Sequence, residues 1–479
     1  MPPPAERRTT WFTADRLALA GLLVFTLLVR GGVLWVMRGN LEQDPDAYRE
    51  IAENLLRHGE FALGKGEPEG GDKTYRPTAY RPPLYPVVLS NLPASDRQHV
   101  SLAKIGVLHV LLGVATVWLT WLTARRMCGV GSAHLDQQVV GIAHPTILAG
   151  PLLAGLIVAC DPILLNQQTL VMTETLAAFL AILSLWCLAR FDAARSWFNA
   201  ALAGGAIGLA ALCRPTFLPW LGMVGIAMLI VRGRCAERGT RNAERRNVSS
   251  WFDDFGWRAA SLAGLAIAAA AIISPWAIRN YRVFGKPIVT TTHGGYTLRL
   301  GNNPQFYEWL RTSRHGLPWD DFQFSAVEAD AARTTSPGSL SITFWDDWCY
   351  HRALDTIRHQ TGDFARACVY RIGQLWSPLP HKLTADESTG RRLLRYATCA
   401  WYCGVYLLAA IGVWRLRWRM FQSPWIWGVL LCLAFTAVHT FYWTNLRMRA
   451  PLVPFVAIVA AAALEKKTER QGGGETKRR

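Results

Sequence analysis

Charged side chains are scarce in this sequence, and the signatures of several protein classes are missing from it. Asp, Glu, Lys and Arg make up only 18% of its 479 residues, below the roughly 25% of an average soluble domain. The 10 cysteines form neither a metal-ligand pair nor a disulfide framework. No nucleotide loop of the Gly-Lys-Ser type occurs, which argues against an ATP-driven pump. Sustained strand alternation and internal repeats are also absent from the sequence.

Long apolar runs are what the sequence has instead. Hydrophobic residues make up 51% of the chain, and runs near the length of about 20 residues that a membrane-spanning helix needs recur along it. The pattern predicts an all-α polytopic membrane protein, with a further half-buried helix over 83–92. We expect spans near 17–37, 102–122, 141–165, 171–190, 198–213, 216–232, 258–278, 396–414, 425–443 and 450–464.

The first apolar run is predicted to be a span and not a signal peptide. Arg7, Arg8 and Arg16 precede it, but the run continues past Arg30 to Met37 and no Ala-x-Ala-like site ends it. Arg30 is expected to face other helices or to extend toward the membrane surface, because a bare charge inside a span is costly.

Most of the net charge of +17 lies in short segments between the apolar runs. A basic chain can indicate nucleic-acid binding, but Lys and Arg in short loops between spans act as topology signals, so we expect no nucleic-acid partner. With the N-terminus, six segments carry this charge on one side, which we assign to the cytoplasm. Their basic residues are Arg125 and Arg126; Arg190 and Arg195; Arg232, Arg234, Arg238, Arg241, Arg245 and Arg246; Arg415, Arg417 and Arg419; and Lys466, Lys467, Arg470, Lys477, Arg478 and Arg479.

This assignment predicts a multi-pass protein of the cytoplasmic (inner) membrane with two long outward segments. The second outward segment should hold amphipathic helices near 321–334 and 344–369, with turn signals at 301–304 and 336–338. The expected divisions are a cytoplasmic N-terminus 1–16, a transmembrane bundle 17–278 that includes the first extracytoplasmic loop 38–101, a large extracytoplasmic loop 279–395, C-terminal transmembrane helices 396–464 and a basic cytoplasmic tail 465–479.

Segment 44–61, directly after the first span, predicts a helix that lies along the membrane surface. Pro45 suits the start of a helix with Asp44 as its N-cap, and Gly59 suits its end. Asp44 and Asp46 would then lie at the positive end of the helix, where a carboxylate stays ionised as a general base must. The alternative is that Asp44 is only a cap and Asp46 only a partner of the helix dipole.

Two further charged residues are expected at the membrane boundary. Arg81 precedes Pro82 and Pro83, which force an extended entry into an apolar run. There it can hold a lipid phosphate by paired hydrogen bonds, or serve as an interfacial anchor beside tyrosines. Glu174 lies at the outer end of a span, which is a functional position by default or a capping position.

Other outward arginines break the general charge bias, and each fits either a phosphate ligand or a contact to lipid headgroups. They are Arg214, Arg279, Arg447 and Arg449. The isolated His109, His144 and His439 favour structural histidines over metal ligands.

A series of short motifs occurs in a fixed order between about residues 16 and 464. In that order the sequence resembles the GT-C glycosyltransferases of the protein O-mannosyltransferase and aminoarabinose-transferase superfamily. The motifs are Asp44 with Tyr48 four residues on, Ala52-x-Asn54-Leu55, Gly59-x-Phe61, Arg81-Pro82-Pro83-Leu84-Tyr85-Pro86, Met172-Thr173-Glu174, Gly208-Leu209-x-x-Leu212-x-Arg214-Pro215, Trp276-x-Ile278-Arg279-Asn280-Tyr281-x-x-Phe284-Gly285, Gly294-Gly295-Tyr296, Leu300-Gly301-Asn302-Asn303-Pro304 and Leu446-Arg447-x-Arg449-x-Pro451-x-x-Pro454.

The resemblance implies a bundle of about 10–12 transmembrane helices, with interfacial helices in two extracytoplasmic loops. It also implies a polyprenyl-phosphate-linked sugar as donor, used among membrane lipids on the extracytoplasmic side. In those families an aspartate of the first outer loop is the catalytic base, and Asp44 matches it by its spacing to Tyr48. Relatives often have Glu directly after that aspartate; here Pro45 stands there, and Asp46 is the candidate for a second carboxylate. Arg81 matches the lysine that relatives place near the donor phosphate.

The resulting expectation is an inverting glycosyltransferase with Asp44 and Asp46 as catalytic candidates. The phosphate-binding candidates are Arg81, Arg279, Arg447 and Arg449, and further site candidates are Tyr48, Tyr85 and Glu174. No metal ligand is assigned, a divalent metal is left open, and the acceptor stays unidentified. The rival interpretations are a transporter or flippase of a lipid-linked substrate, and a non-enzymatic membrane scaffold.

Overall fold

A computed structural model describes residues 4–64, 75–129, 146–194, 196–230, 249–312, 319, 342–382 and 387–464 of the chain; side chains are described from Asp15 on, except at 129, 146–148 and 249–255. The described part is helical apart from two paired two-residue strands, β1 (Ala62–Leu63) and β2 (Arg76–Pro77). The fold is therefore all-α, as predicted.

Long apolar helices form a bundle. They are α1 (Pro4–Val36), α4 (Leu102–Gly129), α5 (Thr146–Ala159), α7 (Glu174–Ala194), α8 (Trp197–Cys213), α9 (Phe217–Ile230), α10 (Ser249–Phe284), α16 (Thr389–Leu416), α17 (Trp425–Phe441) and α18 (Val453–Ala461), the last preceded by η4 (Leu446–Leu452) and followed by η5 (Ala462–Leu464). Among the described residues, six helices are long and apolar enough to cross a membrane, and shorter apolar helices accompany them. The chain is a multi-pass membrane protein, and each predicted span overlaps one of these helices. The span expected over 141–165 is divided, because α5 ends at Ala159 and α6 (Pro162–Gln167) begins three residues later.

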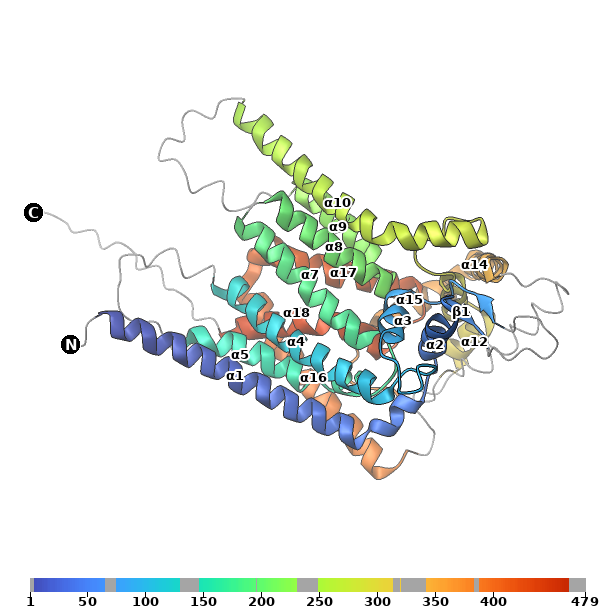
Figure 1. Cartoon of the computed structure of the whole chain (residues 1–479), viewed down its shortest axis with the longest axis horizontal. Helices are drawn as coiled ribbons and strands as arrows, with labels where there is room; N and C mark the ends of the chain where they lie inside the picture. Colours follow the sequence, from blue (N-terminus) through green and yellow to red (C-terminus); the bar gives the residue numbers. More distant parts are fainter. Residues whose placement is uncertain are drawn as a thin grey trace, which may run out of the picture.

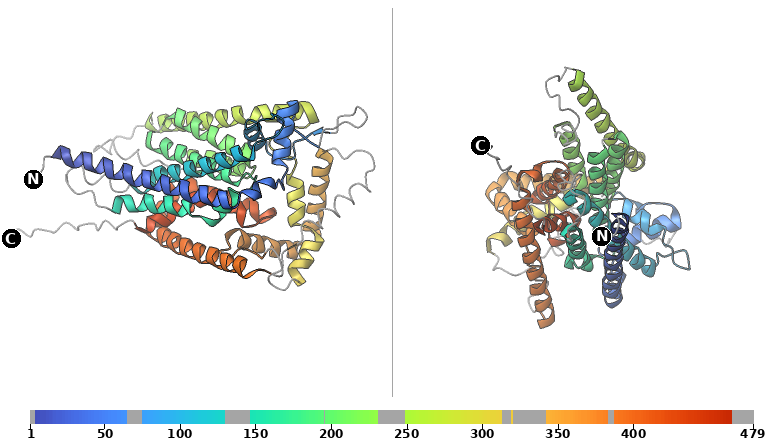
Figure 2. Two further views of the ribbon diagram at one scale, coloured as in Figure 1. Left: turned by 60° about the horizontal axis from the view of Figure 1, so that its bottom comes forward. Right: turned by 90° about the vertical axis from the view of Figure 1, so that its left-hand side faces the viewer.

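The remaining elements lie between the spans. They are η1 (Arg38–Glu42), α2 (Tyr48–His58), α3 (Leu84–Ser90), α6 (Pro162–Gln167), α11 (Gly294–Gly301), α12 (Pro304–Thr312), α14 (Ile342–His359), α15 (Thr361–Trp376) and η3 (Arg417–Phe421). In Figure 1, α1 begins at the left end of the bundle, whereas α2, α3, β1, α12 and α14 gather at the right end, which we call the loop end. Figure 2 shows the yellow and orange helices of the second loop lying across that end.

Small residues allow α8 and α10 to pack closely. A Cβ atom on Gly204 would overlap the backbone oxygen of Leu265, and one on Gly208 would lie 3.2 Å from the Cα of Ala269. Close approach of backbones at small residues is how helices gain contact area in a membrane, where apolar burial alone gives little drive to associate.

Arg30 is fully buried and faces other helices, as one of its two predicted placements required. Its guanidinium donates to the Gln168 side chain at 3.0 Å and to the Val158 carbonyl at 2.9 Å. The Gln168 amide returns a hydrogen bond to the Arg30 carbonyl at 3.0 Å. These bonds tie α1 to α5 and to the turn between α6 and α7.

Several predicted boundaries are wrong. The helix expected from residue 44 begins at Tyr48, because the chain turns at Ala47, whose φ is 57°. The pattern at 344–369 is two helices, α14 and α15, divided at Gln360. The spans flanking the second loop extend into it, since α10 continues to Phe284 and α16 begins at Thr389. Continuous hydrogen bonding carries a helix past its apolar run, which sequence hydropathy does not register.

Some expectations lie outside the described residues. They concern the helix at 321–334, the turn at 336–338, His144, Arg195, the basic cluster 232–246 and the tail 465–479.

The glycine pair Gly204-Gly205 offers a matched test of the helix packing. Gly204→Ala should lower the thermal stability of the purified protein, by about 1–3 kcal/mol as overpacking does, because the new methyl group overlaps Leu265. Gly205→Ala should not, since nothing lies within 4 Å of its Cβ position. Equal melting temperatures for the two variants would contradict the close approach of α8 and α10.

Candidate active site

The turn before α2 holds Asp44 in an unusual arrangement. Its Oδ2 accepts the backbone N–H groups of Arg49 at 2.9 Å and Glu50 at 3.0 Å. Its Oδ1 is buried and has no hydrogen-bond partner. Asp44 therefore caps α2 from one turn upstream with one oxygen, although Ala47 is the N-cap residue. The second oxygen therefore keeps an unused capacity to accept a hydrogen bond.

Burial and hydrogen bonding act on Asp44 in opposite directions. Burial raises the pKa of its carboxyl above the ordinary value, and the backbone N–H donors and the charge of Arg49 oppose that rise without cancelling it. A carboxylate with a raised pKa is a better proton acceptor near neutral pH than an exposed one.

Asp46 lies two residues on and forms an ion pair with Arg81. The Arg81 Nη2 lies 2.7 Å from Asp46 Oδ1, and its Nε donates to the Asp46 carbonyl at 2.9 Å. The guanidinium also lies over two aromatic rings, 4.6 Å from the centroid of Tyr80 and 5.5 Å from that of Tyr48. Arg81 is thus fixed in position by Asp46 and two tyrosines.

Tyr48, whose ring lies under the Arg81 guanidinium, packs against Tyr85. Their ring centroids are 5.3 Å apart in an edge-to-face contact, and Tyr85 Oη lies 2.8 Å from His109 Nε2. His109 Nδ1 lies 2.8 Å from the Gln168 carbonyl, to which it donates, so Nε2 accepts the tyrosine proton. The expectation of a satisfied structural histidine is confirmed for His109.

Glu174, the first residue of α7, joins two arginines from distant parts of the chain. Its Oε1 lies 3.2 Å from Arg214 Nη1 and 3.6 Å from Arg447 Nε. The Glu174 side chain is 1% exposed, whereas that of Arg447 is 32% exposed. One carboxylate therefore compensates two cations, and Arg447 still presents surface.

The Asp46–Arg81 pair and the group of Glu174, Arg214 and Arg447 lie near the same tyrosines. The charges of Arg81, Asp46, Glu174 and Arg214 all act on Tyr48, and those of Asp44 and Glu174 both act on Tyr85. The structure thus brings together these candidates of the sequence: Asp44, Asp46, Tyr48, Arg81, Tyr85, Glu174 and Arg447.

Arg279 lies apart from this group. Its guanidinium donates to the carbonyls of Thr78 and Phe61 at 2.8 and 2.9 Å. Trp276 and Asn280, from the same end of α10, donate to the carbonyls of Thr290 and Ile288. The motif around Arg279 therefore fastens both loops to α10.

Arg449 is buried elsewhere in the bundle. It donates to the carbonyls of Leu375 and Ser377 and lies 4.0 Å over the Tyr402 ring. Tyr402 donates to Asp161, the N-cap of α6, whose charge acts on the same tyrosine. Arg449 thus stabilises the α15–α16 region.

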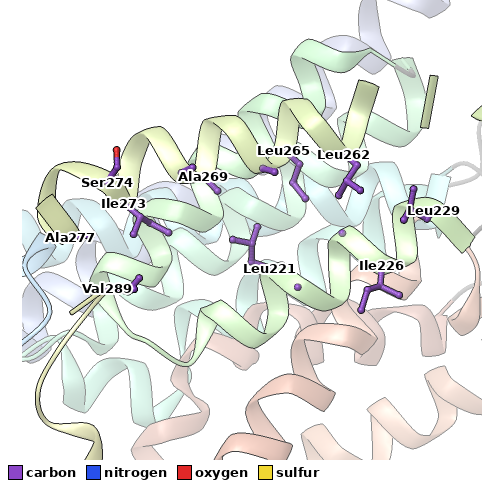
Figure 3. A pocket seen from close by; sticks show the side chains of 14 residues that line it. Leu221, Ile226, Leu229, Leu262, Leu265, Ala269, Ile273, Ser274, Ala277 and Val289 are labelled. Atoms are coloured by element: carbon purple, nitrogen blue, oxygen red, sulfur yellow. The ribbon is translucent and has the colours of Figure 1, made fainter. Parts of the chain in front are cut away.

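An apolar groove of about 570 Å³ runs between α9 and α10 (Figure 3). Leu221, Ile226 and Leu229 line it from α9, and Leu262, Leu265 and Ile273 from α10. Val289 closes the end nearest the loops.

Three aromatic side chains beside the site escaped the sequence analysis as site residues: Tyr80, His293 and Tyr296. His293 and Tyr80 rings lie 4.4 Å apart, and those of His293 and Tyr296 lie 5.0 Å apart. The Gly294-Gly295 motif at the start of α11, which lies between His293 and Tyr296, could have pointed to these residues. Within the described residues no group of three or more His, Cys, Asp or Glu side chains could hold a metal ion.

No family model matches the sequence, and no curated protein matches it. Similar solved structures include AglB, an archaeal oligosaccharyltransferase from Archaeoglobus fulgidus in complex with an inhibitory peptide and a dolichol-phosphate, at 13% identity and a TM-score of 0.48 over 93% of this chain and 50% of that one. ArnT from Cupriavidus metallidurans bound to undecaprenyl phosphate is 14% identical, with a TM-score of 0.36 over 95% and 78% of the two chains. Arabinosyltransferase EmbB from Mycobacterium smegmatis is 15% identical, with a TM-score of 0.32 over 92% and 40%.

The chain thus spans about half the length of the archaeal enzyme. These neighbours are GT-C glycosyltransferases, the class that the sequence resembles.

Arg279→Lys should separate a structural arginine from a functional one. An ammonium group cannot reach the Thr78 and Phe61 carbonyls in the geometry of a planar guanidinium, so we expect a lower melting temperature. Arg282→Lys, on an exposed position of the same helix, is the matched control and should melt as the wild type does. An unchanged melting temperature in Arg279→Lys would show that the loops do not depend on this contact.

Proposed function

We propose that this protein is a membrane glycosyltransferase that uses a polyprenyl-phosphate-linked sugar. The observation that carries the proposal is the divided carboxylate of Asp44. One of its oxygens accepts two N–H groups at the N-terminus of α2, and the other is buried and unpartnered. Asp46, two residues on, pairs with Arg81. Transfer of a sugar from a phosphate needs a base to deprotonate the acceptor and cations to stabilise the leaving phosphate.

The proposed reaction is a single displacement with inversion. Asp44 Oδ1 takes a proton from a hydroxyl or amine of the acceptor, and the resulting nucleophile attacks the anomeric carbon. The bond between that carbon and the phosphate oxygen breaks through a transition state of oxocarbenium character. The phosphate leaves as an anion, so no acid is needed to protonate it.

Cations must stabilise the charge that develops on the leaving phosphate. Arg81 and Arg447 are the proposed ligands, because both belong to the site and Arg447 keeps exposed surface. Arg214 supports Arg447 through their shared partner Glu174. Arg279 donates to two backbone carbonyls, and Arg449 donates to two others through Nη1. We assign both of them structural roles because these bonds join separate parts of the chain.

Asp46 is proposed to position Arg81 and not to act as a second base. Its carboxylate is already committed to the guanidinium at 2.7 Å. An ion pair of this kind fixes the direction of the remaining N–H donors, which suits the planar recognition of a phosphate.

The groove between α9 and α10 is proposed to hold the polyprenyl chain. Its lining is apolar, and its volume of about 570 Å³ falls within the range of ordinary ligand sites. Val289, at the loop end of the groove, leads within three residues to Thr292, whose N–H donates to the Ala79 carbonyl beside Arg81. A lipid in the groove would place its phosphate toward the site.

The loop end of the bundle is proposed to face away from the cytoplasm, in the cytoplasmic membrane. Arg126 and Arg415, at the ends of α4 and α16, lie opposite the loop end, as short basic segments on the cytoplasmic side do. Segments 38–101 and 279–395 would then be extracytoplasmic, and the acceptor would be a lipid, glycan or protein on that side.

The proposed function is tested by expressing the Asp44→Asn variant in a strain from which the gene for this protein has been deleted. Asn can still accept the N–H groups of Arg49 and Glu50, so the protein should insert and fold. Transfer should fall on the order of 10²–10⁴-fold with loss of the base. The deletion strain should accumulate a polyprenyl-phosphate sugar that the wild-type gene clears and the Asp44→Asn gene does not.

Asp46→Asn provides the comparison. It should reduce clearance less than Asp44→Asn, through weaker donor binding. A well-folded Asp44→Asn protein with near wild-type clearance would reject Asp44 as the base, and a greater loss in Asp46→Asn would exchange the two roles.

A further inference from the structure

An aromatic group extends the site beyond the charged residues. It consists of Tyr80, His293 and Tyr296, and it begins at Arg81, whose guanidinium lies 4.6 Å over Tyr80. The His293 ring meets Tyr80 edge-on and stacks on Tyr296. All three side chains are only partly buried, so ring surface remains for a ligand to contact.

The backbone holds this group rigidly. Thr292 donates its N–H to the Ala79 carbonyl at 2.8 Å, and the Thr291 hydroxyl donates to the Tyr80 carbonyl at 2.5 Å. These two bonds join the loop that carries His293 to the loop that carries Arg81. The aromatic group therefore keeps a fixed place relative to the proposed phosphate ligand.

Two glycines fix the other end of the group. A Cβ atom on Gly294 would overlap the Tyr350 hydroxyl, and one on Gly295 would overlap the Asp346 backbone. The Gly295 N–H donates to Asp346 Oδ1 at 2.6 Å. Close packing against α14 thus sets the position of the residues on either side, His293 and Tyr296.

His293 is an uncharged hydrogen-bonding group. Burial lowers its pKa well below the usual value, and the positive charge of Arg81 lowers it further, so the imidazole is neutral at pH 7. Its Nδ1 is buried and has no hydrogen-bond partner. A neutral imidazole offers one nitrogen as donor and the other as acceptor.

We propose that Tyr80, His293 and Tyr296 form the subsite for the sugar of the donor, and that this sugar is uncharged. The inference rests on the proposed function and specifies its substrate. A sugar held there would place its C–H face on the aromatic rings, whose faces carry partial negative charge. A hydroxyl of the sugar would pair with His293 Nδ1.

The charge balance favours a neutral sugar over an amino sugar. Arg81 is the charge that acts on His293, and the negative charge of Asp46 is already compensated by Arg81. The carboxylate that lies against this group, Asp346, already accepts the Gly295 N–H at 2.6 Å, so an ammonium group would lose water and compete with that hydrogen bond for its partner, which is costly. A sugar hydroxyl loses less hydration free energy than an ammonium group and can pair with His293 Nδ1.

The test is lipid binding to the purified protein in nanodiscs, which needs no acceptor. The probes are undecaprenyl phosphate mannose, undecaprenyl phosphate aminoarabinose and bare undecaprenyl phosphate. The wild type should bind the mannose lipid most tightly of the three. His293→Ala should weaken binding of the mannose lipid about tenfold, as loss of a partner for a desolvated polar group does, and leave binding of the bare lipid unchanged.

Two conservative variants locate the contact. Asn places its side-chain oxygen near the position of Nδ1, and Gln places it near Nε2, so His293→Asn should retain most of the affinity while His293→Gln should resemble His293→Ala. His359→Ala, an exposed histidine on α14, is the matched control and should bind all three lipids as the wild type does.

The outcomes separate the inference from the proposed function. A wild type that binds none of the three lipids would overturn both. Equal losses for mannose lipid and bare lipid in His293→Ala, or no loss, would overturn the subsite and leave the proposed function standing. Tighter binding of the aminoarabinose lipid by the wild type would overturn the uncharged sugar.

Discussion

The ion pair between Arg81 and Asp46 is the interaction on which the rest of the site depends. It joins the turn before α2 to the entry of α3, two segments separated by 35 residues, and it places the guanidinium over Tyr48 and Tyr80. A charge near membrane depth is tolerated only with a partner, and an arginine paired through two of its nitrogens keeps its remaining donors in a fixed direction. Asp44, two residues from Asp46, is held by a different contact, the hydrogen bonds from the backbone N–H groups of Arg49 and Glu50.

The four arginines that the sequence offered as phosphate ligands divide according to the oxygens that they meet. Arg81 and Arg447 meet carboxylates, which leaves them part of a group whose charge can respond to an anionic ligand. Arg279 through two of its nitrogens, and Arg449 through Nη1 alone, meet backbone carbonyls and so fasten loops and helices together. The same residue type therefore supplies both the proposed anion site and the contacts that support it, and the partner of each arginine distinguishes the two uses.

Sequence reasoning was most successful where the physics is local. The lengths of the apolar runs predicted the helical bundle, and the αL conformation of Gly59 at the end of α2 agrees with its role as a terminator. The start of α2 was missed because the turn at Ala47 carries no sequence signal. The roles of Arg279 and His293 were not predictable, since each depends on contacts with residues far away in the chain. For His293, a single histidine in a loop has no spacing pattern to reveal it.

The central claim is that a partly buried Asp44 takes the acceptor proton, and the pH dependence of transfer tests it most directly. The base must be ionised, so the rate should fall as the pH drops through the pKa of Asp44. Burial raises that pKa, so the fall should occur above the ordinary aspartate value of about 3.9. The measurement is kcat/KM for transfer from a polyprenyl-phosphate sugar between neutral pH and about pH 4. The account predicts a single acidic limb within that range; a rate that stays constant across it would contradict Asp44 as the base.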